Sequence, residues 1–356
     1  MTEKYFICNM FFDESFIIKD RFFIQQEELA LQYVNKNDRT ASFEVHNIAY
    51  DCQWIQNKSW NSELPAVLIP IKNNKELLSF TLSNLKANDL HLHSNIIVID
   101  DRSQNDLKSI TIKNNFSYLR IDNSKGFNFS MLNNIAAKIC YDLGIKEIVL
   151  WNSDLWCVKK EWFPALLEKH RKHNSTLTGT KLVYPPIKKG FITEENTENI
   201  RTTFPSQSNK WRNTVQFGGS SWPPQGPLSC VGIAPSHRGR FHSLESDEVN
   251  WEGEETFVTG AFQIINLKEF IKIGGFNPSL AKNFQDVDLC LKLKEQNKKI
   301  FYFGKNLYMY HGESISLVKE GKYDDQMTSD HVLFGRLWHK KIYRRLLKEK
   351  ACISVC

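Results

Sequence analysis

The sequence predicts an α/β fold with a mainly parallel central sheet and helices on both faces. Apolar runs of strand length alternate with segments of helical periodicity from about residue 65 to residue 183, and this alternation is typical of βαβ units. Several of the runs end abruptly in amide or carboxylate side chains. Because ligands of open α/β sheets bind beyond the carboxyl ends of the strands, these endings are the first candidates for a functional site.

The first half of the domain is expected to contain four buried strands with helices between them. The strands are apolar runs at Ala66–Ile71, Asn95–Ile99 and Tyr118–Ile121, and a run from Glu147 that ends in Asn152-Ser153-Asp154. Helical spacing is found in the segment of Leu77, Leu82 and Leu85 and again over Ser130–Leu143, where Gly144 ends it. The order strand, helix, strand supports a parallel sheet covered on both faces.

The second half is less regular. After Val183 the periodicity is lost for about 70 residues, and an irregular segment of this length inside a compact domain is usually functional or mobile. Order returns with a strand over Thr256–Ile265, a helix over Leu267–Ile273 and a further helix that starts near Asp286. A last strand, Leu307–Tyr310, is expected at an edge of the sheet.

The chain is expected to have three parts. Residues 1–64 form an N-terminal extension of unknown role, and residues 65–320 form the α/β domain, with the irregular segment at about 184–255. Residues 321–356 form a basic amphipathic helical segment with an apolar stripe through Leu333 and Leu337. That segment fits either a helix on an anionic membrane surface or a helix packed on the domain.

Composition and missing motifs exclude several classes of protein. A hydrophobic content of 41% over 356 residues excludes a disordered chain, and a net charge of +6 does not imply a nucleic-acid partner. The sequence contains no apolar run long enough to span a membrane, and its start is not expected to act as a signal peptide. Its eight cysteines are scattered without a Cys-x-x-Cys pair. We therefore expect reduced thiols and a cytoplasmic protein. Neither Gly-x-Gly-x-x-Gly nor a Walker loop follows a predicted strand, which excludes a dinucleotide fold of that type.

Four acidic side chains are expected on one side of the sheet: Asp100, Asp101, Asp154 and Asp286. Asp154 suits Mg²⁺ or Mn²⁺, which prefer oxygen ligands and commonly share them with substrate phosphates. Asp286 is ionised at neutral pH and can accept a hydroxyl proton as a general base. The same residue also fits a capping arrangement with Asn283 at a helix start, and spacing leaves both roles open.

Several motifs in order along the chain resemble the inverting glycosyltransferases of family 2, in particular the rhamnosyltransferase-like branch. The resemblance runs from about Pro65 to Ile342. The motifs are Val98–Ser103, Gly126–Asn134, Trp151–Asp154, Val258–Ala261, Gly274–Phe276, Asp286–Lys292 and Tyr310–Ser314. The resemblance implies the GT-A fold for residues 65–320, a Rossmann-like sheet that binds a nucleotide.

The resemblance also implies roles for individual residues. The donor nucleotide is expected to contact Pro70, Asp100, Asp101, Asn133 and Asp154, with one of the two adjacent aspartates at the pyrimidine base. A Mn²⁺ or Mg²⁺ ion is expected on Asp154 and His311, and Asp286 is the expected catalytic base. The acceptor or phosphate side is expected to include Arg238, Arg240, Gly260 and Gln285, with His237 as a further candidate for phosphate.

The implied function is metal-dependent, inverting transfer of a sugar from a UDP- or dTDP-sugar to a hydroxyl group. The acceptor is a glycan or a lipid-linked glycan, the setting is cell-surface polysaccharide synthesis, and the implied location is cytoplasmic, with peripheral contact on the inner face of the membrane. The sequence does not name the sugar.

Two residues depart from the family pattern. Asn152 replaces the first acid of Asp-x-Asp, and Gln285 replaces the glutamate of the acidic pair. Asn152 keeps a second hypothesis open, a non-catalytic relative that binds carbohydrate or nucleotide sugar. A third, a sugar nucleotidyltransferase, needs a glycine-rich basic loop after the first strand, which Ile69–Asn74 lacks.

Overall fold

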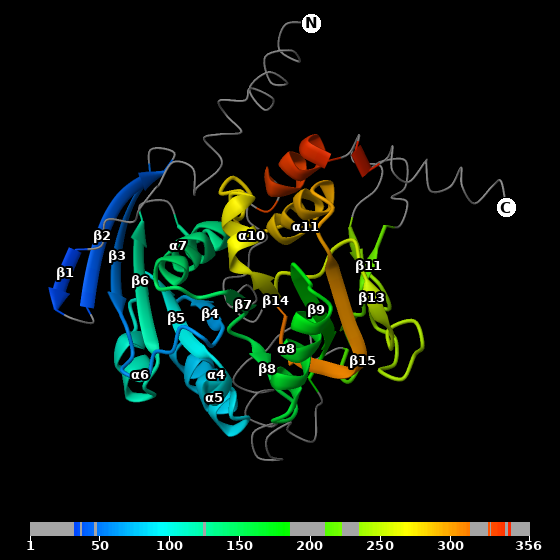
Figure 1. The fold of residues 1–356 in the computed structure, drawn as a ribbon, viewed down its shortest axis with the longest axis horizontal. Helices are drawn as coiled ribbons and strands as arrows, with labels where there is room; N and C mark the ends of the chain where they lie inside the picture. Colours follow the sequence, from blue (N-terminus) through cyan, green and yellow to red (C-terminus); the bar gives the residue numbers. More distant parts are fainter. Residues whose placement is uncertain are drawn as a thin grey trace, which may run out of the picture.

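The structure is a computed structural model of the chain, and it describes residues 32–35, 38–45, 48–123, 126–185, 211–222, 235–313, 327, 329–338 and 341–342. Within these residues, thirteen strands form one mixed sheet, with helices packed on both of its faces (Figure 1). A separate pair of short strands, β11 and β12, lies outside this sheet. The predicted α/β class is therefore confirmed.

The centre of the sheet is parallel, in the order β6-β5-β4-β7. These strands are β4 (Ala66–Ile71), β5 (Asn95–Asp101), β6 (Ser117–Asn123) and β7 (Glu147–Trp151). Every residue of β4 and β5 is buried, as expected for strands that are covered on both faces. All four strands coincide with predicted apolar runs.

The sheet continues from β7 through strands of both directions. They are β14 (Phe262–Asn266), β9 (Leu177–Val183), β15 (Ile300–His311) and β13 (Glu252–Glu254), with β8 (Leu155–Trp156) beside β15 and β10 (Val215–Phe217) beside β9. Because β14 is antiparallel to both β7 and β9, and β15 is parallel to β9, the strands β7, β9 and β15 point the same way. Their carboxyl ends share one edge of the sheet. The separate pair is β11 (Ser220–Ser221) and β12 (Ser236–His237).

Two strand predictions need correction. The strand expected over Thr256–Ile265 begins only at Phe262, because the Gly260 amide donates to a side chain on a helix instead of to a neighbouring strand. The strand that contains Leu307–Tyr310 is not an edge strand. It lies between β9 on one side and β13 and β8 on the other.

The N-terminal strands extend the same sheet. They are β1 (Gln32–Asn35), β2 (Asp38–Val45) and β3 (Ile48–Ile55), joined as antiparallel neighbours. The third pairs antiparallel with β6 along six residues, Tyr50 to Ile55, and Tyr50, Cys52 and Trp54 are buried in the core of the domain. Residues 32–55 are therefore continuous with the α/β sheet.

Helices cover both faces of the sheet (Figure 1). One face carries α4 (Lys75–Ala87), α5 (Leu90–His93), α6 (Leu107–Lys113) and α8 (Trp162–Lys172), and the other carries α7 (Phe129–Asp142), α10 (Leu267–Lys272) and α11 (Gln285–Glu295). The helix α4 begins where the Asn74 side chain accepts a hydrogen bond from the Leu77 amide, a typical N-cap. The cysteines of the described ranges, Cys52, Cys140, Cys157 and Cys290, are free and buried.

The helical residues 329–338 near the C-terminus lie beside α11 (Figure 1). Phe334, Trp338 and Ile342 are buried, and the Trp338 indole Nε1–H donates to Asp288 Oδ1 over 2.8 Å. Of the two arrangements expected for this segment, packing on the domain therefore accounts for its buried apolar side chains. No helix in the described part of the chain is both long and apolar enough to cross a membrane.

Candidate active site

The acidic residues singled out from the sequence gather at one edge of the sheet. Asp100 and Asp101 close β5, Asp154 follows β7, and His311 ends β15. All three strands run in the same direction. The chain order of the motifs thus becomes a spatial cluster at the carboxyl end of the sheet, where ligands of such sheets bind.

Strand register brings Asp154 and His311 together. The short strand β8 pairs antiparallel with the end of β15, so that Leu155 lies opposite His311, and the Gly312 amide donates to the Asp154 carbonyl oxygen over 2.8 Å. As a result, Asp154 Oδ1 lies 3.4 Å from His311 Nε2, with both side chains almost fully buried. The two residues expected to hold a metal ion are therefore neighbours.

The ring of His311 is held from its other side by Gln216 of β10. His311 Nδ1 lies 2.8 Å from Gln216 Oε1, and the amide nitrogen of Gln216 donates to Glu313 Oε1 over 3.2 Å. His311 Nε2 is buried and makes no hydrogen bond to a described residue. A buried nitrogen of this kind is available as a ligand.

Asp154 and His311 fit a divalent cation that is shared with substrate phosphates. Among the residues that the structure describes, no group of three or more His, Cys, Asp or Glu side chains is arranged to hold a metal ion. Mg²⁺ sites commonly use one or two carboxylates and complete the coordination with water and substrate phosphate oxygens. One buried carboxylate and one unpartnered imidazole nitrogen match a site of that kind better than a permanent metal centre.

The cationic residues expected at the phosphate side are held in ion pairs. Arg240 donates to Glu313 Oε1 over 2.7 Å and to the Tyr184 hydroxyl over 2.9 Å. Burial alone raises the pKa of Glu313, but the Tyr184 hydrogen bond and the Arg240 charge outweigh burial, and the pKa of this carboxyl is lowered. Arg238 lies 4.7 Å above the Trp251 ring and 3.4 Å from Glu255.

His237 differs from these two arginines because it carries no charge at neutral pH. Burial lowers the pKa of His237 to about 4, and the Arg240 charge adds to that effect. Its Nδ1 lies 3.0 Å from the Gln216 carbonyl oxygen. A neutral imidazole binds phosphate poorly. The hydrogen-bond contact with the backbone of β10 therefore indicates a structural role for His237.

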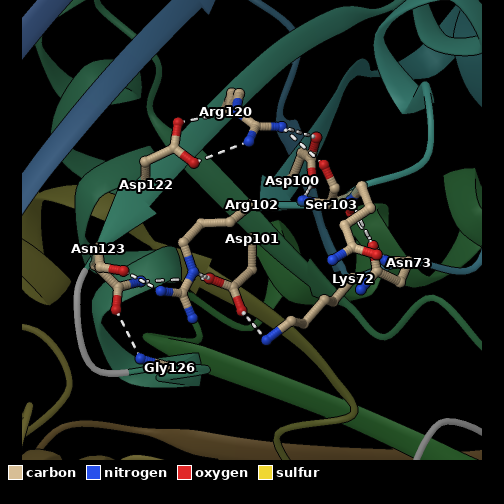
Figure 2. A network of polar contacts seen from close by, with 11 residues as sticks. Lys72, Asn73, Asp100, Asp101, Arg102, Ser103, Arg120, Asp122, Asn123 and Gly126 are labelled. Carbon is tan, nitrogen blue, oxygen red and sulfur yellow. Dashed lines mark hydrogen bonds and ion pairs between the residues drawn. The ribbon is translucent and has the colours of Figure 1, made fainter.

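Asp100 and Asp101 have different surroundings (Figure 2). Asp100 Oδ1 accepts from the Ser103 amide over 2.8 Å, and its Oδ2 accepts from the Tyr118 hydroxyl over 2.5 Å and from Arg120 over 3.3 Å. Both carboxylate oxygens are therefore engaged within the protein. Asp100 shapes the loop after β5 and has little capacity left for a ligand.

Asp101 keeps more capacity for a ligand. Its Oδ1 accepts from Asn123 over 3.3 Å and lies 3.6 Å from Arg102, whereas its Oδ2 accepts no hydrogen bond from the described chain and lies 3.5 Å from the Lys72 ammonium (Figure 2). Burial raises the pKa of Asp101, and the charges of Lys72 and Arg102 oppose that rise. Of the two adjacent aspartates, Asp101 is the better candidate for contact with a nucleotide.

The loops after β4 and β5 are cross-linked by residues that the sequence analysis did not select. The Asn73 amide donates to Ser103 Oγ over 2.9 Å, and the Gln104 amide donates to Asn73 Oδ1 over 2.6 Å. Lys72 and Asn73 follow β4 directly, just as Asp101 ends β5. Polar residues directly after a buried strand were the signal that selected the aspartates, and Lys72 and Asn73 carry the same signal after β4.

Pro70 and Asn133, the remaining donor-side candidates, lie inside regular elements. Pro70 is buried in β4 beyond Leu68, where pairing with β7 stops, so its missing N–H breaks no ladder on that side. Asn133 is buried in α7, and its amide donates to the Phe129 carbonyl oxygen over 2.8 Å. Its Oδ1 has no hydrogen-bond partner in the described chain, and the structure shows no hydrogen bond between it and Asp100, Asp101 or Asp154.

Asp286 lies in the first turn of α11. Its Oδ2 accepts from the Gly260 amide over 2.6 Å and its Oδ1 accepts from the Val287 amide over 2.8 Å. The N-cap is Phe284, which makes no side-chain capping bond, and the Asn283 amide donates to Asp330 instead. The predicted capping arrangement between Asn283 and Asp286 is therefore wrong. Asp286 is half-buried, and burial raises its pKa while the backbone hydrogen bonds oppose the rise.

Gly260 connects Asp286 to the metal-side residues. A Cβ at Gly260 would lie 2.9 Å from Asp286 Cβ, which is closer than such atoms approach in proteins. The next residue, Ala261, accepts a hydrogen bond from the Asn152 amide over 3.0 Å. Asp286 and Asp154 thus come from adjacent loops of the same edge. The neighbouring Gln285 is buried, and its Oε1 accepts no hydrogen bond from the residues described.

Comparison with known families finds a match over the part of the chain that forms the parallel centre of the sheet. Residues 66–223, which include β4 to β9 and Asp154, match the sequence profile of the family described as Glycosyl transferase family 2. The rhamnosyltransferase-like branch stays a prediction. No curated protein sequence matches the chain.

Several solved structures are similar to this chain at low identity. A crystal structure of GalNAc-T7 with UDP, GalNAc and Mn²⁺ is 12% identical, with a TM-score of 0.49 over 70% of this chain and 44% of its own. The crystal structure of TarS 1-349 from S. aureus is 14% identical, with a TM-score of 0.43 over 77% of this chain and 70% of its own. A third structure is the mannosyltransferase PcManGT from Pyrobaculum calidifontis in complex with GDP-Man and Mn²⁺. It is 10% identical, with a TM-score of 0.43 over 72% of this chain and 59% of its own. The chain spans less than two thirds of the first and third of these proteins.

Proposed function

We propose that the protein transfers a sugar from a nucleoside diphosphate sugar to a hydroxyl group of a glycan or glycolipid, with inversion and with the help of a divalent metal. The observation that carries the proposal is the 3.4 Å approach of Asp154 Oδ1 to His311 Nε2. It lies at the edge where Asp101 and Asp286 also gather. A carboxylate and an imidazole nitrogen on one side of a transfer site, with a carboxylate base on the other, form a complete set of groups for this reaction.

On the donor side, each residue has a separate task. Asp101 accepts hydrogen bonds from the pyrimidine ring of a UDP or dTDP donor, while Asp100 keeps the β5 loop in shape through Tyr118 and Arg120. Asp154 and His311 are the ligands for Mn²⁺ or Mg²⁺. When bound, either ion supplies positive charge that stabilises the departing diphosphate.

On the acceptor side, Asp286 takes the proton of the attacking hydroxyl. The acceptor oxygen forms a bond to the anomeric carbon as the bond from that carbon to the diphosphate oxygen breaks, and the hydroxyl proton moves to an Asp286 oxygen. Because one displacement inverts the anomeric centre, no covalent intermediate on the enzyme is needed. The Gly260 amide holds Asp286 Oδ2 in place, which is the positioning that a general base requires.

The proposed setting is polysaccharide synthesis on the cytoplasmic side of a membrane, with a lipid-linked acceptor and peripheral attachment. The apolar side chains Phe334, Trp338 and Ile342 of the C-terminal helix pack on the domain. Attachment would therefore depend on attraction between basic residues and anionic lipid rather than on insertion of an apolar helix face.

A second candidate function is binding of a nucleotide sugar without turnover. Asn152 in place of an acid and Gln285 in place of a glutamate favour it, because both changes remove negative charge from the edge. Under this alternative the protein holds the donor but transfers nothing. The two functions share Asp101, Asp154 and His311, and they differ in the need for Asp286.

The test is a panel of thermal-unfolding measurements with UDP, dTDP and GDP, each with and without Mn²⁺, followed by assays of transfer and of slow donor hydrolysis. A ligand at 100 times its dissociation constant stabilises the native state by about 2.7 kcal/mol. We expect UDP or dTDP to raise the midpoint only when Mn²⁺ is present, and Asp154→Asn to abolish this shift. Binding without hydrolysis or transfer would favour the second candidate, and the absence of any nucleotide effect would exclude both.

A further inference from the structure

Gln216 contacts both His311 and Glu313 through its side-chain amide. It lies in the middle of β10, where Val215 and Phe217 pair with β9, and it is 2% exposed. Its side chain lies between two partners, with His311 Nδ1 2.8 Å from Oε1 and Glu313 Oε1 3.2 Å from the amide nitrogen. Both ends of the amide are therefore engaged.

The surroundings of Glu313 determine which way this amide points. Arg240 and the Tyr184 hydroxyl both donate to the Glu313 carboxylate, over 2.7 and 2.6 Å. A carboxylate that receives these donors is an acceptor toward Gln216 as well, so the NH₂ group of Gln216 must face it. A reversed amide would place two oxygen acceptors against each other in a buried site, which is costly.

When the side-chain NH₂ group of Gln216 faces Glu313, its side-chain oxygen Oε1 faces His311. That oxygen can only accept, so Nδ1 of His311 must carry the hydrogen. In a neutral imidazole the other nitrogen, Nε2, then has a free lone pair. This nitrogen is buried, makes no hydrogen bond in the described chain and lies 3.4 Å from Asp154 Oδ1.

We propose that Gln216 is a positioning residue that holds His311 as the Nδ1–H tautomer, so that Nε2 and Asp154 together present two electron-pair donors to a divalent cation. The inference rests on the proposed function, since it assigns the cation to the transfer reaction. In the competing tautomer the hydrogen on Nε2 would point toward Asp154 and would take up the lone pair that a cation needs. The Glu313–Gln216 contact opposes that tautomer from the far side of the ring.

Further contacts keep the chain Glu313–Gln216–His311 rigid. The backbone carbonyl oxygen of Gln216 lies 3.0 Å from His237 Nδ1. Arg240 donates hydrogen bonds to both Glu313 and Tyr184 and so links them. Partners of a metal-binding histidine typically fix its tautomer and ring orientation, and their loss typically weakens metal binding 10- to 100-fold. Gln216 is placed to act on His311 in this way.

The tautomer can be measured directly with ¹⁵N-labelled histidine and long-range ¹H–¹⁵N NMR at about pH 8, where an ordinary imidazole is neutral. His311→Ala identifies the His311 signals by their disappearance. We expect the wild-type ring to show a protonated Nδ1 and an unprotonated Nε2, and Gln216→Leu to shift the ring toward the Nε2–H form. A wild-type ring with Nε2–H, or with both nitrogens protonated, would overturn the inference whatever the activity of the protein.

Metal affinity gives the second measurement. Mn²⁺ is titrated into the protein in the presence of UDP, and free Mn²⁺ is followed by its electron paramagnetic resonance signal. We expect Gln216→Leu to weaken Mn²⁺ binding by roughly 10- to 100-fold. The control Gln296→Leu makes the same chemical change at the exposed end of α11 and should leave the affinity unchanged.

A second substitution guards against misfolding of Gln216→Leu. Gln216→Met has an unbranched side chain of similar length but no hydrogen-bonding amide, so it should also shift His311 toward the Nε2–H form and weaken Mn²⁺ binding. If Gln216→Met unfolds at the wild-type temperature yet keeps the wild-type tautomer and affinity, the inference is wrong. If the wild-type protein binds no Mn²⁺ with UDP, the proposed function fails instead, and the NMR result still decides the tautomer.

Discussion

Asp154 Oδ1 lies 3.4 Å from His311 Nε2 although the two residues belong to widely separated parts of the chain. The approach depends on the antiparallel pairs Leu155–His311 and Trp156–Tyr310 between β8 and β15. A slip of one residue in that pairing would turn His311 to the opposite face of the sheet. The metal side of the site is therefore set by strand register more than by any local motif.

Asn152→Asp should strengthen metal binding. Asn152 is partly exposed, and the described structure shows no hydrogen bond to its side chain, so a carboxylate can replace the amide without loss of an internal contact. It adds negative charge two residues before Asp154, where hard cations prefer oxygen ligands. We expect the dissociation constant for Mn²⁺ in the presence of UDP to fall by about tenfold, an electrostatic gain of about 1.4 kcal/mol, as measured by calorimetric titration.

The matched control is Asn174→Asp. It makes the same charge change at an exposed position just before β9, at the opposite edge of the sheet. It should leave Mn²⁺ affinity unchanged. Equal effects of the two variants would mean that net charge, and not the position of Asn152, sets the affinity.

Asp286→Asn should slow transfer severely and leave donor binding intact. Asparagine retains an oxygen that can accept from the Gly260 amide but cannot take up the hydroxyl proton. We expect kcat to fall by roughly 10²- to 10⁴-fold, the usual contribution of a general base, with the UDP–Mn²⁺ thermal shift preserved. Turnover close to that of the wild type would remove Asp286 from the mechanism.

The pH dependence of wild-type transfer should report the same group. Burial raises the pKa of Asp286 above its ordinary value, and only the deprotonated carboxylate is a base. Activity should therefore fall on acidification at a higher pH than an exposed aspartate would give, and it should be constant above that range until another group titrates. A profile of kcat/KM against pH provides the measurement, and an acid limb at the ordinary aspartate pKa of about 3.9 would contradict the assignment.

The strand ends can be recognised from the sequence because their chemistry is local. An apolar run followed by Asn152-Ser153-Asp154 can be recognised without any tertiary information, and the same holds for Asp100 and Asp101 after β5. The predicted strands at 66–71, 95–99 and 147–151 agree closely with β4, β5 and β7. Burial on both faces produces this signal, since every residue of such a strand must be apolar.

The residues that support the site could not be found in this way. Gln216 and Glu313 are ordinary polar residues in the sequence, and Gln216 lies in the segment without periodicity. Their importance comes from hydrogen bonds between β10 and the end of β15. Similarly, spacing alone gave no reason to prefer Asp101 over Asp100. The difference depends on Tyr118 and Arg120, which saturate one carboxylate from the neighbouring strand.

Gly260→Ala should disable the site through Asp286. The added Cβ would lie 2.9 Å from Asp286 Cβ and 3.3 Å from its Cγ, so the carboxylate must move away from the Gly260 amide. We expect a loss of kcat of at least tenfold, in line with the cost of a small displacement at a reacting group. The apparent affinity for UDP–Mn²⁺ should change little, because the donor side is built from other residues.

A double-mutant cycle separates the steric effect from a general loss of stability. Asp286→Gly removes the Cβ that the alanine would meet, so Gly260→Ala should destabilise the Asp286→Gly background less than it destabilises the wild type. Urea denaturation measures both free energies of unfolding. Equal costs in the two backgrounds would show that the alanine acts elsewhere.

His170 should make the domain sensitive to mild acid. This side chain is 3% exposed in α8, with Nδ1 2.8 Å from Thr178 Oγ1, and burial lowers its pKa to about 4. Between this value and the ordinary value of 6.5 the unfolded chain binds the proton more tightly, so stability is complete above pH 6.5 and falls as the pH drops toward 4. The full difference corresponds to about 3 kcal/mol.

His170→Gln should reduce the change of the free energy of unfolding between about pH 7 and pH 5, as measured by urea denaturation. The same change at the exposed His173, at the end of α8, should not reduce it. If His170→Gln loses stability with acid as steeply as the wild type does, other buried groups, such as His237 with its similarly lowered pKa, must account for the acid sensitivity.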